Sequence, residues 1–148
     1  MKKFLNLGLQ PLANSYLKKK NLKLKEKKFK LEVGFNKKNY LVSIINTVSK
    51  EKMFNDKYPY KSSESKTMRK SFKDLTTKVK KRFKPNFIIE IGSNDGVFMK
   101  NFNKKNIVGV EPCKNLAKLT KNINYTTYSE YWSMKLARKI TINKKAEL

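Results

Sequence analysis

The chain has 148 residues, a formal net charge of +25 and apolar side chains at 39% of its positions, so it can form one ordinary domain or two small ones. One cysteine and no histidine exclude an internal disulfide bond and leave out the usual ligands of zinc. There is no signal peptide, and no window approaches the roughly 18 apolar residues of a membrane span, so we expect a soluble, cytoplasmic protein without membrane contact.

The first 65 residues predict short strands and turns rather than long helices. Gly8 and Pro11 interrupt an otherwise apolar segment, and β-branched or aromatic residues cluster further along. The expected elements are an irregular segment at 5–17, strands at 29–33 and 40–45 joined by a turn at 34–39, a helical turn at 50–54 and a loop at 56–65.

The rest of the chain predicts one long helix followed by a β-α-β-α-β-α series. Apolar residues recur at helical spacing in 65–81, at Met68, Phe72, Leu75 and Val79, and we expect Ser65 to cap this helix. We then expect strands at 87–91, 107–110 and 125–127, helices at 97–102, 115–122 and 130–140, and the start of another strand at 144–148. This order implies an α/β fold with a parallel sheet and right-handed crossovers.

One turn carries the chemistry. The buried strand ends at Glu90, and a glycine-containing loop leads into a helix, in the sequence Glu-Ile-Gly-Ser-Asn-Asp-Gly at 90–96. Glycine lets the backbone turn tightly and approach a ligand closely, and the helix that follows offers free N–H groups. Ligands of parallel α/β sheets bind beyond the carboxyl ends of the strands. The candidate cofactor-binding residues here are Glu90, Gly92, Ser93, Asn94, Asp95 and Gly96.

Glu111 and Pro112 complete the candidate site. Glu111 follows the second strand, where a nucleoside-binding fold places an acid against two ribose hydroxyls. A carboxylate can accept both O–H groups of a vicinal diol. The loop lacks the middle glycine of a pyrophosphate-binding turn and holds Asp95, so it suits S-adenosylmethionine, which has no phosphate and carries a sulfonium cation. An ordinary glycine turn with a surface acid is the simpler alternative.

Four segments resemble sugar C-methyltransferases that act on nucleotide-linked deoxysugars. They are 7–16 (LGLQPLANSY), 54–65 (FNDKYPYKSSES), 90–96 (EIGSNDG) and 109–112 (GVEP), in the family's order. The resemblance implies a Rossmann-like class I methyltransferase domain, of which 63–148 would be the N-terminal half. It implies that 1–62 is the remnant of a small zinc-binding-type domain, and that the chain is truncated at both ends.

The resemblance also implies a reaction and its participants. A base takes the proton beside a keto group of a nucleotide-sugar, and the carbon then accepts a methyl group from S-adenosylmethionine. The candidate catalytic residues are Tyr58 and Tyr60, for which packing of a turn is an equal alternative. The second Cys-x-x-Cys pair of the family falls on 36–39 (NKKN), so we expect no zinc and no metal site.

Several functions stay open. The chain can be a cofactor-binding but catalytically incomplete methyltransferase, an active one completed by a separate chain, or an inactive truncated product. A basic nucleic-acid-binding module is a further alternative, and its affinity would fall steeply with salt. We expect nucleic acid not to be the partner, because the basic residues are scattered lysines and the arginines are only Arg69, Arg82 and Arg138.

Overall fold

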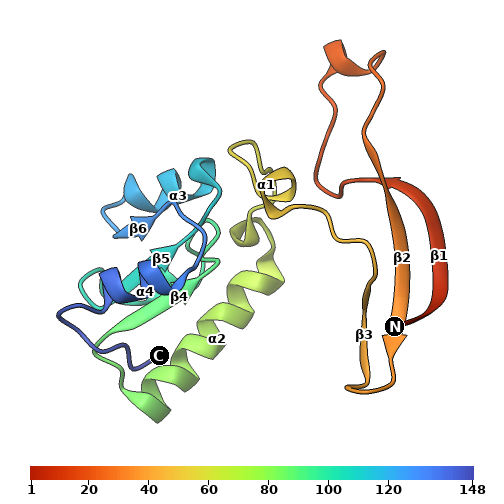
Figure 1. The fold of residues 1–148 in the computed structure, drawn as a ribbon. Coiled ribbons are helices and arrows are strands. Elements are labelled where there is room, and N and C mark those ends of the chain that lie inside the picture. The colour runs from red at the N-terminus through yellow and green to blue at the C-terminus, as the bar shows by residue number, and fades with distance from the viewer. The chain divides into compact units, whose positions relative to one another are not determined.

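The computed structural model describes residues 1–148, which divide into two compact units, Met1–Phe54 and Asn55–Leu148 (Figure 1). The domain boundary predicted between residues 62 and 63 stays a prediction. None of the helices combines the length and the apolarity that crossing a membrane requires.

The first unit is a three-stranded antiparallel sheet in the order β1-β2-β3. Its strands are β1 (Lys2–Pro11), β2 (Lys28–Asn36) and β3 (Leu41–Ile44), with the short helices η1 (Lys19–Asn21) and α1 (Lys50–Met53). The strands predicted at 29–33 and 40–45 are confirmed. Gly34 is the only buried residue of the unit, so this sheet has no core of its own.

The irregular segment predicted at 5–17 is wrong in its first half. β1 pairs with β2 along its whole length, and the pairing shifts register between Lys3 and Leu5 and between Asn6 and Leu9. Gly8 lies in the second shift with a φ of 71°, a conformation that glycine adopts without strain. The residues that predicted a turn therefore form a bulge inside a strand.

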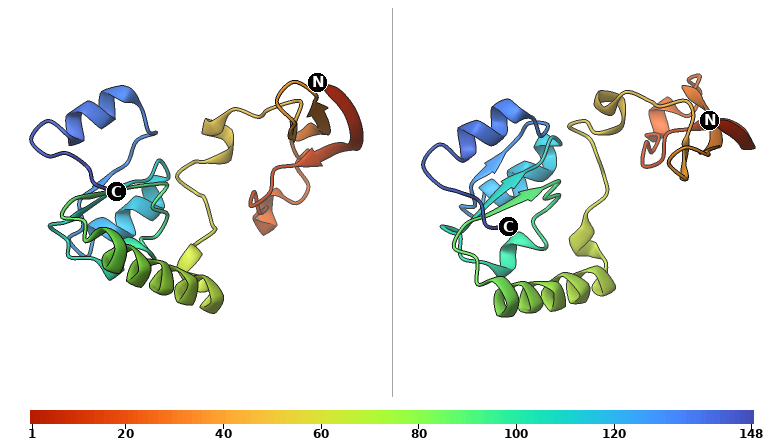
Figure 2. Two further views of the ribbon diagram at one scale, coloured as in Figure 1. Left: turned by 90° about the horizontal axis from the view of Figure 1, so that it is seen from below. Right: turned by 60° about the horizontal axis from the view of Figure 1, so that its bottom comes forward.

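The second unit contains a parallel sheet in the order β4-β5-β6, so the α/β class with a parallel sheet is confirmed, and the arrangement is compatible with part of a Rossmann-like fold. The strands are β4 (Ile88–Ile91), β5 (Ile107–Val110) and β6 (Thr127–Tyr128). The helices are η2 (Ser62–Glu64), α2 (Lys66–Phe83), η3 (Met99–Asn101), α3 (Lys114–Lys121) and α4 (Met134–Ile140). Figure 2 shows α2 along one face of this sheet and α4 beyond the opposite face.

The direction of strand addition reverses at β4. The chain steps from β4 to β5 and then to β6, and Ile88 N donates to Asn106 O on the β5 side. Residues Glu147 and Leu148 return to β4: Glu147 N donates to Phe87 O at 3.0 Å, and Ile89 N donates to Leu148 O at 2.9 Å. Adjacent backbone N–H groups of a strand point to opposite edges, so 147–148 lie on the edge away from β5. Such a reversal point is where open α/β sheets bind ligands.

A single apolar cluster supports this sheet. Val79 of α2 packs with residues of β4, of η3 and its flanks, of β5 and of the segment before β6, namely Ile88, Phe98, Met99, Phe102, Ile107 and Tyr125, and Phe72 packs against them. Ser65 caps α2 as expected, because its Oγ accepts from Met68 N at 3.3 Å. Pro85 follows a left-handed Lys84 that ends the helix.

Three details of the predicted helices are wrong. Leu75 is 46% exposed, and Thr76 is buried in its place, because the buried stripe runs through Phe72, Thr76 and Val79. The helix predicted at 97–102 is a single 3-10 turn, and the helix predicted from residue 130 begins at Met134. Trp132, 40% exposed, therefore lies outside the helix whose face it was expected to share.

Candidate functional site

The turn after β4 is fixed against the end of β5 by its backbone. Gly92 N and Ser93 N both donate to Val110 O, at 2.8 and 3.1 Å, and Gly96 N closes the turn onto Ser93 O. Gly92 and Gly96 have φ angles of 73° and 80°, and Asn94 has a φ of 49°. The sequence thus supplies glycine or asparagine, the residues that best tolerate this region, at each left-handed position.

The two glycines of the turn differ in their surroundings. A Cβ at Gly96 would lie 2.4 Å from Thr120 Cγ2, so this glycine lets the turn pack against α3. A Cβ at Gly92 would meet nothing within 4 Å. Gly92 therefore borders open space at the carboxyl end of β4, and a ligand could approach its backbone there.

Glu111 joins the end of β5 to the turn. Its Oε2 accepts from Asn94 N and its Oε1 from Cys113 N, both at 2.8 Å, and only 5% of the residue is exposed. Each carboxylate oxygen has two lone pairs, so these two bonds leave acceptor capacity for a ligand. The structure brings Glu111 to the Gly92–Gly96 turn, and Pro112, half-buried, follows it.

Glu90 is a buried acid at the same edge. The pKa of its carboxyl is raised to about 8, mainly by burial and to a smaller extent by the negative charges of Asp95 and Glu111, while a backbone hydrogen bond at Met99 acts in the opposite direction. At pH 7 this carboxyl therefore holds a proton. Its Oε2 has no hydrogen-bond partner, and the same is true of the buried Ser93 Oγ. Buried polar atoms without partners are rare in proteins and mark positions where a ligand or water supplies the missing bond.

Cys113 is a buried thiol beside Glu111. Burial raises its pKa to about 12, and the charge of Glu111 acts in the same direction. The thiol therefore stays protonated, and it is 1% exposed and donates a side-chain hydrogen bond to Glu111.

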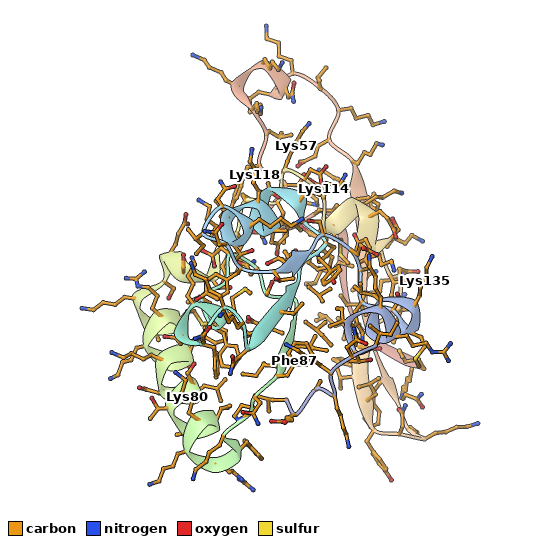
Figure 3. The ribbon with its side chains drawn as sticks, turned by 90° about the vertical axis from the view of Figure 1, so that its left-hand side faces the viewer. Lys57, Lys80, Phe87, Lys114, Lys118 and Lys135 are labelled. Carbon is orange, nitrogen blue, oxygen red and sulfur yellow. The ribbon has the colours of Figure 1, made fainter.

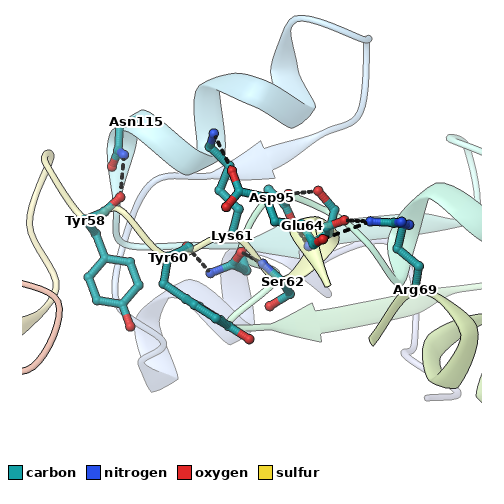
Figure 4. A network of polar contacts seen from close by, with 10 residues as sticks. Tyr58, Tyr60, Lys61, Ser62, Glu64, Arg69, Asp95 and Asn115 are labelled. Atoms are coloured by element: carbon teal, nitrogen blue, oxygen red, sulfur yellow. Dashed lines mark hydrogen bonds and ion pairs between the residues drawn. The ribbon is translucent and has the colours of Figure 1, made fainter. Parts of the chain in front are cut away.

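A strap of residues 58–63 crosses the site and is held by side chains of the turn and of α3 (Figure 4). Asn94 Nδ2 donates to Tyr60 O at 3.2 Å, and Asn94 Oδ1 accepts from Ser62 N at 2.9 Å. Asp95 Oδ1 accepts from Ser63 N at 3.3 Å, and its Oδ2 accepts from Ser63 Oγ. Two consecutive residues of the turn, Asn94 and Asp95, therefore bind the strap through their side chains.

Two further residues hold the strap, and sequence reasoning missed both. Asn115 Nδ2 donates to Tyr58 O at 2.8 Å, and its Oδ1 is buried without a partner. Arg69 Nη1 donates to Ser63 O and to Glu64 O. All three bonds join a side chain to a backbone carbonyl, and no pattern in the sequence predicts that kind of contact.

The candidate tyrosines of the strap, Tyr58 and Tyr60, lie beside the cofactor candidates. Tyr60 is 45% exposed, and Tyr58 is half-buried. Figure 4 shows both rings directed to the side of the strap away from Asn115. The structure thus gathers the predicted residues around one edge of one sheet.

Comparison with known families gives a match for the first unit. Residues 1–54 match the family model Methyltransf_13, described as a putative zinc binding domain, and these residues coincide with the Met1–Phe54 unit of the structure. The match supports a relation to a methyltransferase family. No curated protein matches the chain at a significant level.

This match corrects our expectation about zinc, which was that none would be bound. A domain related to putative zinc binding domains contradicts it. The donor set nevertheless does not fit the metal's usual ligands: residues 1–54 contain no cysteine or histidine, and the chain has no group of three His, Cys, Asp or Glu residues arranged to hold a metal. Of the carboxylates, Glu32 is held by Lys3 Nζ and Asn46 Nδ2, both at 2.8 Å, and Lys3 lowers its pKa.

Proposed function

We propose that the chain binds S-adenosylmethionine at the carboxyl ends of β4 and β5 and takes part in methyl transfer. The observation that carries this proposal is the bond from Asn94 N to Glu111 Oε2 at 2.8 Å, beside the open space at Gly92. This bond joins Glu111, which can accept hydrogen bonds from a ribose diol, to the turn at Gly92, which a nucleoside can approach. The methyltransferase-associated domain in residues 1–54 supports the same conclusion.

The residues present fit this cofactor. Glu90 Oε2 and Ser93 Oγ are buried without partners, so the site has polar atoms that a ligand could satisfy. Asp95 and Glu111 bring two carboxylates to one edge beside the neutral carboxyl of Glu90, which favours a ligand carrying ammonium and sulfonium charges and disfavours a pyrophosphate. When bound, the cofactor would supply an electrophilic methyl group on a sulfonium sulfur.

The substrate class follows from the sequence resemblance. We propose a nucleotide-linked deoxysugar with a keto group, methylated at the neighbouring carbon. A base of the protein must take the proton of that carbon. Tyr58 and Tyr60 are the candidates: the chain contains no histidine, and the binding of their backbone carbonyls by Asn115 and Asn94 supports this proposal. Completion of the site by a separate chain stays a prediction.

Basic side chains lie on several elements of the second unit: Lys80 of α2, Lys118 of α3 and Lys135 of α4 project from different helices (Figure 3). Recognition of nucleic acid needs a basic stripe along one face or helix. Of these helices, α2 carries six lysines and two arginines among its 18 residues, so nucleic-acid binding stays an alternative, tested by an affinity that falls steeply with salt.

Binding of S-adenosylhomocysteine, the demethylated product, tests the proposed function. We expect heat on titration into the full chain, and about 1–3 kcal/mol weaker binding by Glu111→Gln, which loses acceptor capacity at the diol. Asp74→Asn, which changes the same charge on the exposed face of α2, is the control and should bind like the wild type. Circular dichroism checks that each variant is folded. No binding by the wild type, or equal binding by Glu111→Gln, contradicts the proposal.

A further inference from the structure

Asn94 contacts both Glu111 and the strap. Its backbone N–H is bound to Glu111, the acid expected to hold the ribose, and its side chain is bound to the strap at Tyr60 and Ser62. The side chain thus uses both its donor and its acceptor on the strap. A shift of the turn on ligand binding would therefore reach the strap through one residue.

Asp95 repeats this connection one position further on. Its carboxylate is 2% exposed and receives both the N–H and the hydroxyl of Ser63. The acid is therefore occupied by the strap. Within the turn, then, Gly92 and Ser93 border the open or unsatisfied part of the site, while Asn94 and Asp95 hold the strap.

The backbone of the strap depends on these side chains for its order. Tyr60 O, Ser62 N and Ser63 N are bound by Asn94 and Asp95 and belong to no sheet. The only regular element here is the single 3-10 turn η2, so the strap opens more readily than the strands and the long helix, because few bonds must break together. Anything that fixes the turn would suppress that opening.

We propose that Asn94 and Asp95 are positioning residues that couple occupancy of the nucleoside site at Glu111 to docking of the strap that carries Tyr58 and Tyr60. The inference rests on the proposed function, because the ligand is the nucleoside cofactor or its product. Ligand at Glu111 fixes the turn, the fixed turn holds the strap, and the strap places the two tyrosines beside the bound ligand.

Hydrogen exchange of the full chain, with and without S-adenosylhomocysteine, tests this coupling. The amides of Ser62 and Ser63 report docking, because each is bound to a side chain of the turn. At a ligand concentration of about 100 times the dissociation constant, we expect their exchange to slow by up to about 100-fold. A ligand that stabilises the whole fold slows every amide that exchanges through global unfolding, so the coupling is measured by the loss of this slowing in the variants at position 94.

Substitutions at position 94 separate the side chain from the backbone. Asn94→Gly introduces a residue that adopts a φ of 49° freely, and it keeps the backbone N–H that donates to Glu111. It removes the two hydrogen bonds of the Asn94 side chain to Tyr60 and Ser62. We expect ligand still to bind while exchange of the Ser62 amide, which loses its acceptor, becomes fast and insensitive to the ligand. Asn94→Asp keeps the acceptor for Ser62 N and should restore part of the protection. Lys61→Ala is the control: it removes the exposed ion pair with Glu64, 3.1 Å long, within the strap and should keep full protection.

The outcomes separate the two proposals. No binding of S-adenosylhomocysteine by the wild type overturns the proposed function and the coupling together. Binding without slower exchange at Ser62 and Ser63 overturns the coupling alone. Full protection in folded Asn94→Gly also overturns it, since the strap would then be held without the side chain of Asn94.

Discussion

Replacing Glu90 with glutamine should remove a pH dependence of stability. The pKa of the Glu90 carboxyl is raised from 4.5 to about 8, mainly by burial. The folded chain therefore holds a proton that the unfolded chain has lost between these pH values, and stability falls as the pH rises. The loss is about 1.4 kcal/mol per pH unit, which sums to an upper limit of about 5 kcal/mol over the window. This is a large share of the stability of an ordinary domain.

Urea unfolding at pH 5, 6.5 and 8.5, followed by the fluorescence of the single tryptophan, Trp132, measures this effect. The Glu90→Gln variant and the wild type should differ little at pH 5, and the variant should be more stable by several kcal/mol at pH 8.5. Glu130→Gln, at an exposed acid of the same unit, should follow the wild type at every pH. Parallel stability profiles for Glu90→Gln and the wild type would refute the reasoning that burial keeps Glu90 protonated.

Three further substitutions test the packing of the site. Gly92→Val should abolish binding of S-adenosylhomocysteine in calorimetry and should cost about 1–2 kcal/mol through the φ of 73°; unchanged binding would contradict the placement of the ligand. Gly109→Ala, whose Cβ would lie 2.8 Å from Ser93 Oγ, should lower the free energy of unfolding by about 1–3 kcal/mol, and a neutral result would mean that the turn moves freely. Tyr125→Phe removes the bond from the buried Tyr125 hydroxyl to Phe102 O, 3.1 Å long, and should cost about 1 kcal/mol in urea unfolding without affecting ligand binding.

The sequence predicted the parallel sheet and the placement of Glu111, because both depend on local patterns. An apolar strand, a glycine turn and an acid after the next strand each occupy a short window, and parallel pairing brings the strand ends to one edge. The sequence did not predict β1, since Gly8 signals a turn and a bulge equally well. It also predicted a buried Leu75 where Thr76 is buried instead. Apolar spacing identifies a helix face but does not determine which edge of that face packs against the sheet.

The contacts of the strap could not be predicted for a different reason. Asn115 and Tyr58 are 57 residues apart, and Asn94 and Ser62 are 32 residues apart. An asparagine can bond to any backbone group that the fold brings within reach, so its partner depends on the finished fold. Asn94 and Asp95 were recognised as part of a loop motif, but their connection to the strap depends on three-dimensional placement.

The geometry of Glu111 explains why a glutamate, and not a neutral amide, suits this position. Asn94 N and Cys113 N each take one lone pair of a different carboxylate oxygen, and a carboxylate offers about four such positions in all. The Cys113 thiol donates a further hydrogen bond to this carboxylate, and the remaining acceptor capacity is available to a hydroxyl of a bound ribose. A glutamine would present a single oxygen and an NH2 group that cannot accept from the backbone N–H facing it. The same acid can therefore hold the turn in place and still bind a diol, so the structure of the site and its capacity for a ribose depend on one carboxylate.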